Sequence, residues 1–241
     1  MTWSIVARDP ATGAFGVAVA TKFFAVGALC PHASPHGALA TQALVNPTFG
    51  PRGLRMLAEG RQPVQVMAAL ISSDDGRDHR QLHFVGRDDG AAYTGSACID
   101  WCGHKVAQGY SVAGNMLAGP RVVDDTHAAY ADNAKLPFPR RLIAALMAGE
   151  AAGGDKRGKQ SAALLVWGVE EWPLLGLRVD DHADPLPELA RLERVSRERF
   201  VHFRQFLPTR ANPAGVFDRA TIEAGIAAGL AAEAEEAKAR G

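Results

Sequence analysis

The second residue of the chain is a threonine, and a threonine at this position offers nucleophilic chemistry. Removal of Met1 would leave Thr2 with both its hydroxyl and a free α-amine. An α-amine has an ordinary pKa of about 7.7–8.0, so it can act as a general base near neutral pH. Thr2 therefore predicts a nucleophile and a base in one residue. If Met1 is retained, Thr2 has only an amide nitrogen and this mechanism cannot operate.

Three further side chains are expected beside Thr2. The apolar runs 4–7 and 15–20 flank a turn that contains proline and glycine, so antiparallel pairing returns Thr21 and Lys22 to the start of the chain. Lys22 is expected to stabilise an oxyanion and to lower the pKa of the α-amine. Asn115 follows a glycine, and two interpretations stand: it donates to an oxyanion, or it hydrogen-bonds within its own turn.

Other polar residues are candidates for contacts with a substrate. The glycine-rich basic loop 153–161 is typical of segments that bind a carboxylate or a phosphate, with solvated surface charge as the alternative. From this loop we expect Arg157 and Gln160 at the substrate, together with Ser96 from a glycine-flanked strand end. Asp100 and His104 form either an acid/base pair or a simple surface contact.

The sequence predicts neither a metal nor an organic cofactor. The three cysteines lack a second pair and a Cys-x-x-Cys spacing, so they are interpreted as packing residues. The acidic run 180–184 alternates sides along an extended chain, so its members cannot all face one ion. Neither the P-loop pattern nor a Gly-x-Gly-x-x-Gly after a strand is present.

The elements that must position these residues follow from hydrophobic periodicity and turn residues. Strands are predicted at 4–7, 15–20, 25–29, 37–44, 80–85, 91–94, 105–112, 161–167 and 174–179. Helices are predicted from Asn46 onward, on either side of Gly60, at 122–131, at 139–147, from Pro185 through Phe206, and from Phe217 onward. Strands grouped in hairpins and helices grouped in pairs favour layered α+β packing over an alternating parallel sheet.

Several segments also resemble a known family. They include Met-Thr-Trp-Ser-Ile-Val-Ala-Arg-Asp at the start, Gly-Val-Ala-Val-Ala-Thr-Lys at 16–22, Ala-Thr-Gln-Ala-Leu-Val-Asn-Pro at 40–47 and Gly-Asn-Met-Leu-Ala-Gly-Pro at 114–120. Over residues 2 to about 192 the chain resembles the uncharacterised prokaryotic family DUF1028, which is grouped with the N-terminal nucleophile (Ntn) hydrolases. The resemblance implies a four-layer αββα fold of two antiparallel sheets between helix layers.

The resemblance also aligns Thr2 with the nucleophile of the proteasome-like relatives, with one departure. From this alignment we expect an Ntn-type amidohydrolase that cleaves a carbon–nitrogen bond in a small, carboxylated amide or ureido metabolite. Thr21 stands where proteasome-like relatives have an aspartate, and no lysine follows on the third strand. Gln42 and Asn46 are the polar residues available there. The alternative function is a catalytically inactive binding or scaffold protein with the same fold.

Composition and charge exclude other classes. Lys plus Arg and Asp plus Glu both number 26, so no basic field attracts nucleic acid. No segment reaches the length of about 20 apolar residues that a membrane span needs. We expect a cytoplasmic protein, a small-molecule substrate and a homodimer. The predicted domains are residues 1–205 and a helical extension at 206–241, which is too short for an independent core.

Overall fold

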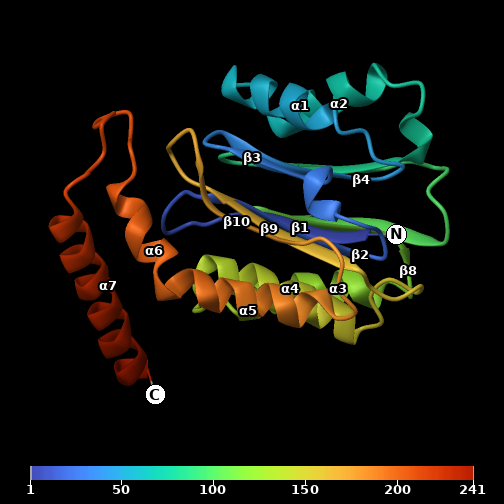
Figure 1. The fold of residues 1–241 in the computed structure, drawn as a ribbon. Helices are drawn as coiled ribbons and strands as arrows, with labels where there is room; N and C mark the ends of the chain where they lie inside the picture. Colours follow the sequence, from blue (N-terminus) through green and yellow to red (C-terminus); the bar gives the residue numbers. More distant parts are fainter. Residues whose placement is uncertain (1, 241) are drawn as a thin grey trace. The chain divides into compact units, whose positions relative to one another are not determined.

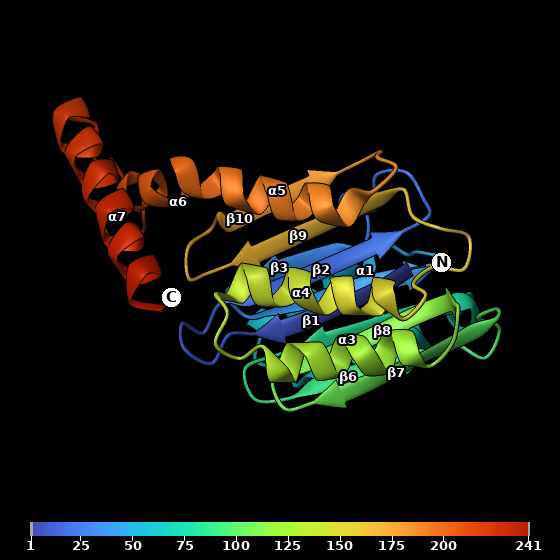
Figure 2. The ribbon, with the colours of Figure 1, turned by 90° about the horizontal axis from the view of Figure 1, so that it is seen from below.

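The computed structural model describes residues 2–240 and contains two antiparallel β-sheets (Figures 1 and 2). The larger sheet has the strand order β10-β9-β2-β1-β8-β7 and the smaller β3-β4-β5-β6. The larger comprises β1 (Thr2–Arg8), β2 (Phe15–Thr21), β7 (Trp101–Ala107), β8 (Tyr110–Leu117), β9 (Ser161–Trp167) and β10 (Pro173–Val179). The smaller comprises β3 (Pro31–Ser34), β4 (Gly37–Ala43), β5 (Arg80–Val85) and β6 (Gly90–Thr94). The predicted mixed α+β class with antiparallel sheets is confirmed.

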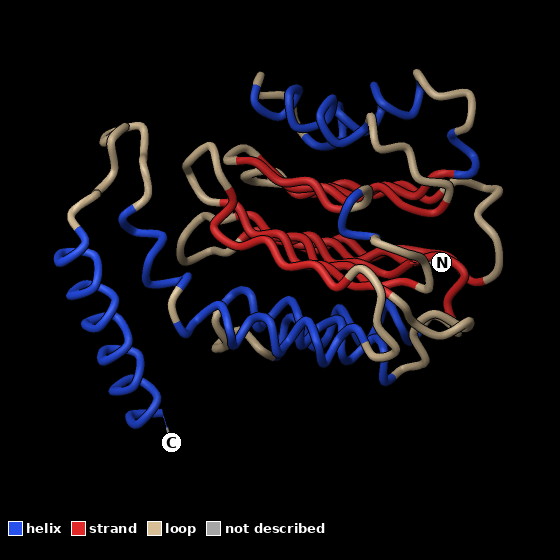
Figure 3. The backbone as a smooth tube through the Cα atoms, viewed as in Figure 1, coloured by secondary structure: helices blue, strands red, loops and turns tan. Residues whose placement is uncertain are grey.

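The two sheets lie face to face, and helices cover their outer faces (Figure 3). Two helices pack on the smaller sheet, α1 (Phe49–Ala58) and α2 (Pro63–Ser72), as predicted on either side of Gly60. Two others, α3 (Arg121–Asp132) and α4 (Phe138–Ala151), pack on the larger sheet.

Alternation along the strands decides what lies between the sheets. On β4, Ala38 and Ala40 face the other sheet while Leu39 packs with α1 and α2. Small side chains therefore fill most of the space between the sheets, and large ones fill the space under the helices. Gln42 continues the inward-facing set of β4, because successive inward residues are two apart. The inter-sheet space thus changes from apolar to polar toward this end of the strands.

The start of β1 lies in the middle of the larger sheet. Thr2 pairs with Thr21 on β2 and with Asn115 on β8, its two neighbouring strands. The prediction that the first hairpin returns Thr21 to the beginning of the chain is confirmed by this register.

Several predicted elements differ from the structure. The segment predicted as a strand at 105–112 is divided by the turn at 108–109 between β7 and β8, and β3 was not predicted. The segment predicted as a strand at 25–29 contains instead the 3-10 helix Val26–Ala28. Ala25 has a φ of 52°, a left-handed conformation that interrupts an extended strand. The predicted helix start at Asn46 is also early, since α1 begins at Phe49 and the Asn46 side chain accepts hydrogen bonds from Thr48 instead.

The chain divides into two compact units, Met1–Ala190 and Arg191–Gly241, so the division falls inside α5 (Pro185–Glu198). The sequence had suggested a boundary at 205/206. Within the second unit, α6 (Phe200–Phe203) contacts α7 (Arg219–Arg240), and Arg199 pairs with Glu223. Among the helices of residues 2–240, none is long and apolar enough to cross a bilayer.

Candidate functional site

Thr2 lies at the edge of the space between the sheets, where β1 begins. Its side chain is 8% exposed, and its Oγ1 is 3.1 Å from the Oγ1 of Thr21. The hydroxyl therefore stays in hydrogen-bond contact with one neighbour while remaining within reach of the surface.

A cavity of about 230 Å³ opens beside Thr2. Its lining comes from β1, β2, β4, the segment that follows β2, and the loop before β9; it consists of Thr2, Thr21, Phe23, Val26, Leu29, Cys30, Thr41, Gln42, Ala43, Leu44, Val45 and Arg157. Most of these side chains are apolar, and Arg157 is the one ionic side chain among them. Thr2, Thr21, Thr41 and Gln42 contribute the uncharged polar side chains, so the cavity combines hydroxyls with an apolar pocket and one cation.

Arg157 is held in place by a buried carboxylate. Asp155 is 4% exposed, and its two carboxylate oxygens accept from the Arg157 guanidinium at 3.4 and 3.3 Å. The same carboxylate accepts from the backbone N–H of Lys22 at 2.9 Å and from that of Arg157 at 2.8 Å. Arg157 also donates to the Lys22 carbonyl at 3.2 Å. This arrangement fixes the guanidinium against the end of β2.

A second cavity, of about 270 Å³, shares Ala43 and Leu44 with the first and is lined in part by Asn115 and Met116. Ala43 has a φ of 65° and Met116 a φ of 54°, and both values lie in the left-handed region that costs free energy for a side chain larger than glycine. Strained backbone of this kind clusters at functional sites. The two strained residues therefore point to this end of the sheets.

Gln81 organises a polar network between the sheets. One end of its amide lies 3.1 Å from the Gly103 carbonyl and 2.8 Å from the Gly114 carbonyl, and carbonyls only accept, so this end is the nitrogen. The Gln81 oxygen then accepts from Gln42 at 2.8 Å and from Asn115 at 3.0 Å. The Asn115 nitrogen also lies 3.5 Å from the Thr2 carbonyl, so its donors are used within the protein.

The same reasoning shows which ring nitrogen of His83 carries the proton. Because the Gln42 nitrogen faces Gln81, the Gln42 oxygen faces Ser4 and accepts its hydroxyl proton at 2.6 Å. The Ser4 oxygen can then only accept from the Nε2 of His83, which is 2.8 Å away. The Nδ1 of His83 lies 3.1 Å from the Ser111 hydroxyl oxygen, which also lies 3.3 Å from the Lys105 carbonyl. His83 thus donates a proton to Ser4 and cannot activate it as a nucleophile.

Burial also excludes His83 as a general base and Cys30 as a thiolate nucleophile. Desolvation lowers the pKa of His83 from 6.5 to about 3, so the ring is neutral at physiological pH. Burial raises the pKa of the Cys30 thiol far above its ordinary value, so it is no thiolate nucleophile. Among the described side chains that line the Thr2 cavity, none is a base near neutral pH. Over residues 2–240 no group of three or more His, Cys, Asp or Glu side chains could hold a metal ion.

The part of the chain that holds this site is similar to known proteins. DUF1028, a family of unknown function, matches residues 2–189. The chain belongs to the DUF1028 family. A crystal structure of a Silicibacter pomeroyi protein assigned to DUF1028 is similar, with a TM-score of 0.84 and 33% sequence identity over 90% of this chain and 96% of that one.

A more distant solved structure is Anbu, an ancestral beta-subunit from Yersinia bercovieri. It has a TM-score of 0.35 and 11% identity over 86% of this chain and 98% of that one, which is too remote to support an argument. No curated protein matched the chain.

The structure brings together only some of the residues that the sequence singled out in this DUF1028 chain. Thr2, Thr21, Gln42 and Arg157 line one cavity, and Asn115 lines the adjacent one.

The remaining candidates lie elsewhere. Lys22 is exposed and directs its Nζ toward the Lys159 carbonyl at 3.5 Å. The Asn46 side chain accepts from the backbone N–H of Thr48, the Ser96 side chain is exposed, and Gln160 donates to Asp181 at 3.0 Å. None of these four lines either cavity.

Asp100 and His104 make separate contacts. Asp100 pairs with Lys156 at 2.7 Å, and the Nδ1 of His104 lies 2.9 Å from the Thr94 hydroxyl. These contacts resemble the surface alternative more than an acid/base pair.

Three buried polar residues of this region were missed by the sequence analysis. Gln81 and His83 are spaced two apart in a strand where they alternate with the apolar Leu82 and Phe84, and this alternation is a signal for polar groups on one buried face. Asp155 lies within the basic loop 153–161. The composition of this loop indicates a cationic segment and does not show that the Asp155 carboxylate orders its backbone.

Proposed function

We propose that this DUF1028 protein is an N-terminal nucleophile amidohydrolase with an αββα fold, active after removal of Met1. The observation that carries the proposal is the Thr2 hydroxyl at the wall of a cavity whose described side chains offer no other base. A freed α-amine on Thr2 supplies that base on the nucleophile's own residue.

The reaction proceeds in two steps. Thr2 Oγ1 attacks the carbonyl carbon of a carbon–nitrogen bond while its proton passes to the α-amine. The tetrahedral intermediate collapses, the carbon–nitrogen bond breaks, and the α-ammonium returns the proton to the leaving nitrogen. Water then attacks the threonyl ester, aided by the same amine, and releases the acid.

The cavity favours a small substrate with one negative charge. A volume of about 230 Å³ lies below the usual range of about 300–1,000 Å³ for ligand pockets. Arg157 is oriented by Asp155 and suits a carboxylate, whereas Phe23, Val26 and Leu29 suit an apolar portion. A carboxylated amide or ureido metabolite fits this lining.

Thr21 and Gln42 are proposed as substrate-positioning groups. Lys22 and Asn115 were expected to stabilise the oxyanion. Asn115 would have to release Gln81 or the Thr2 carbonyl to do so. That occupied amide is the observation that favours the alternative function, a binding protein without catalysis. A cytoplasmic location and a homodimer remain predictions.

Intact mass spectrometry and a hydrolysis assay test the proposal together. In protein purified from its native host we expect a mass that lacks one methionine, and release of amine or ammonia from a panel of carboxylated amides and ureido acids. Thr2→Ala should lower turnover by at least about a thousandfold and remain folded. The activity should rise with pH through about 7.7–8.0 as the amine loses its proton.

A matched control is Thr12→Ala, an exposed threonine in the β1–β2 turn, which should keep full turnover. Full retention of Met1 in an active preparation would refute the mechanism, as would turnover by Thr2→Ala. Processed protein that binds the panel without turning it over would favour the binding function.

A further inference from the structure

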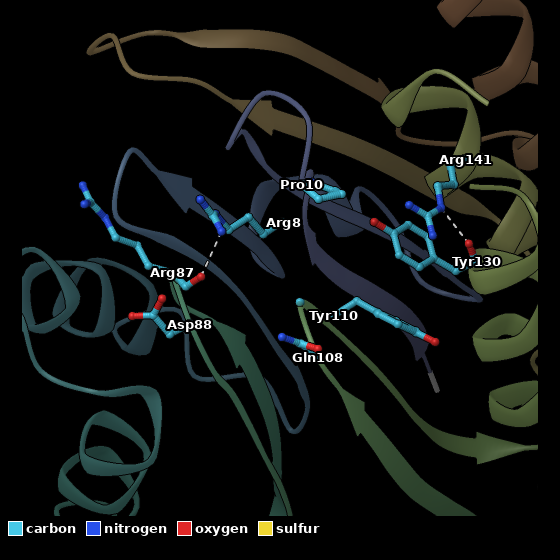
Figure 4. Close-up of a pocket in the computed structure, with 9 residues that line it drawn as sticks. Arg8, Pro10, Arg87, Asp88, Gln108, Tyr110, Tyr130 and Arg141 are labelled. Carbon is cyan, nitrogen blue, oxygen red and sulfur yellow. Dashed lines mark hydrogen bonds between the residues drawn. The ribbon is translucent and has the colours of Figure 1, made fainter. Parts of the chain in front are cut away.

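A third cavity lies at the other end of β1 from Thr2. It has a volume of about 460 Å³ and is lined by Arg8, Pro10, Arg87, Asp88, Gln108, Gly109, Tyr110, Tyr130 and Arg141 (Figure 4). These residues come from the end of β1, the start of β8, the turns β1–β2, β5–β6 and β7–β8, and α3 and α4. Turns from both sheets therefore surround it, and no residue is shared with the Thr2 cavity.

The charge of this lining is positive. Arg8, Arg87 and Arg141 contribute three guanidinium groups, and Asp88 contributes one carboxylate. The nearby carboxylate of Asp9 is occupied in its own turn, where it accepts from Thr12 and from the backbone N–H of Ala11. Three planar cations around a cavity of this size suit an oxyanion, which arginine binds through paired N–H donors.

Two buried donors at this cavity have no hydrogen-bond partner among the described residues. They are the Nε of Arg8 and the hydroxyl of Tyr130, and the Tyr130 side chain is 2% exposed. Figure 4 shows the Tyr130 hydroxyl directed across the cavity toward Pro10 and Arg8. A buried donor without a partner lowers the stability of the fold, so a ligand that accepts from both donors would offset that cost.

The surroundings hold these donors in place. Arg8 donates through Nη1 to the Arg87 carbonyl at 3.1 Å, which fixes the guanidinium plane. Arg141 donates through Nε to the Tyr130 carbonyl at 2.6 Å and lies 3.8 Å over the Tyr130 ring. The Tyr110 ring packs on Tyr130 with centroids 4.6 Å apart. Burial raises the pKa of Tyr130 to about 12, so its hydroxyl remains a donor at physiological pH.

We propose that this cavity is a binding site for a small organic oxyanion, a carboxylate or a phosphate ester. Arg8, Arg141 and the Tyr130 hydroxyl bind the anionic group. The volume exceeds what an anionic group alone would fill, so the ligand carries a further portion against Tyr110 and the turns. The site is independent of the proposed hydrolase chemistry, because Thr2 lies at the opposite end of the strand.

Isothermal titration calorimetry with the full chain tests this site. The probes are phenyl phosphate and phenylacetate, which share a ring and differ in the anion, with benzyl alcohol as the neutral control. We expect saturable binding of one anion per chain, and the tighter probe identifies the anion class. Tyr130→Phe removes only the unpartnered hydroxyl, so it should fold normally and bind about fivefold to tenfold more weakly. Arg141→Gln should weaken binding by at least about tenfold.

Matched variants separate this site from others. Arg55→Gln removes an exposed arginine on α1 and should bind as the unmodified chain does. The variants Thr2→Ala and Arg157→Gln change the lining of the Thr2 cavity and leave this lining unchanged. Both should therefore bind the anion here normally even if the hydrolase proposal fails. The proposal is overturned if neither anion binds below about 10 mM, if benzyl alcohol binds equally well, or if Arg157→Gln weakens binding while Tyr130→Phe does not.

Discussion

His83 shows how a single buried residue can look catalytic and act structurally. A histidine 2.8 Å from a serine hydroxyl suggests an activated nucleophile. The carbonyls that fix Gln81 also fix, through Gln42 and Ser4, a proton on the Nε2 of His83. The ring therefore belongs to the inter-sheet network, and Thr2 remains the proposed nucleophile.

The neutral state of His83 predicts a pH dependence of stability. The folded chain keeps this ring unprotonated down to about pH 3, whereas the unfolded chain protonates it near 6.5. The unfolded state thus binds more protons between these values, and stability falls as the pH falls from about 7 toward 3, by up to about 1.4 kcal/mol per pH unit from this residue. Urea unfolding at several pH values measures this slope.

The variant His83→Gln isolates that contribution, because an amide nitrogen can replace the Nε2 donor and does not titrate. We expect its unfolding free energy to depend less steeply on pH than that of the unmodified chain. Parallel curves for the two proteins would contradict the assignment. Nitrogen NMR shifts of the ring should independently show an Nε2–H tautomer at neutral pH.

At the scale of a residue, the sequence predicted contacts that local pairing determines. The Thr2–Thr21 contact follows from one hairpin, so the pattern of runs 4–7 and 15–20 was sufficient. The contacts of Gln81 and His83 cross between sheets, and no local rule predicts which strands face each other. The position of Lys22 was missed for a related reason: Asp155, more than a hundred residues away, anchors its backbone.

At the scale of elements, one side chain of β5 forms hydrogen bonds with the backbone of the β7–β8 hairpin. The β7–β8 register shifts between Trp101 and Gly103, and Gln81 donates to the carbonyls of Gly103 and Gly114 at this irregularity. A bulge leaves backbone groups outside the regular ladder. Gln81 supplies the donor that the ladder lacks there and so joins the two sheets.

Replacing Gln81 by leucine should therefore be costly. The change removes the donor for two carbonyls and the acceptor for Gln42 and Asn115, so we expect a loss of about 2–4 kcal/mol in the free energy of unfolding. Chemical denaturation measures it. Gln205→Leu serves as the control, because Gln205 is exposed and donates to the His202 carbonyl three residues earlier, and it should change stability by less than about 0.5 kcal/mol. A loss below about 1 kcal/mol for Gln81→Leu would show that the bulge does not depend on it.

Most elements were predictable because their periodicity is strong. The helices on either side of Gly60 and the hairpin around Asp88 and Asp89 lie where the sequence placed them. The prediction of a strand at 25–29 was wrong, because the apolar content of this segment resembles that of a strand. In the structure the left-handed Ala25 turns the chain, and the amides of Ala28, Leu29 and Cys30 donate to carbonyls three or four residues earlier. Composition alone carries no trace of such a turn.

At the scale of the whole molecule, β1 links the two proposed sites. Thr2 at its first residue lines one cavity, and Arg8 at its last lines the other. Six residue steps of extended chain separate them by roughly 20 Å. The sequence predicted the antiparallel sheets but not their strand order, because pairs such as β2–β9 join segments more than a hundred residues apart. The cavity at Arg8 escaped the sequence analysis for the same reason.

The central place of β1 also determines how slowly its backbone meets solvent. β1 has three strands on one side of it in the sheet and two on the other, and Trp3, Ile5 and Val6 are fully buried. Amides in such a position open only in the largest unfolding events, so in deuterium exchange followed by mass spectrometry β1 should be among the last segments to take up label, and the exposed β7 edge much earlier. Early labelling of β1 would contradict this expectation. If β1 exchanges as slowly as expected, the proposed nucleophile Thr2 is held in position before a substrate binds, and the adjustments that binding requires fall to the loops around it.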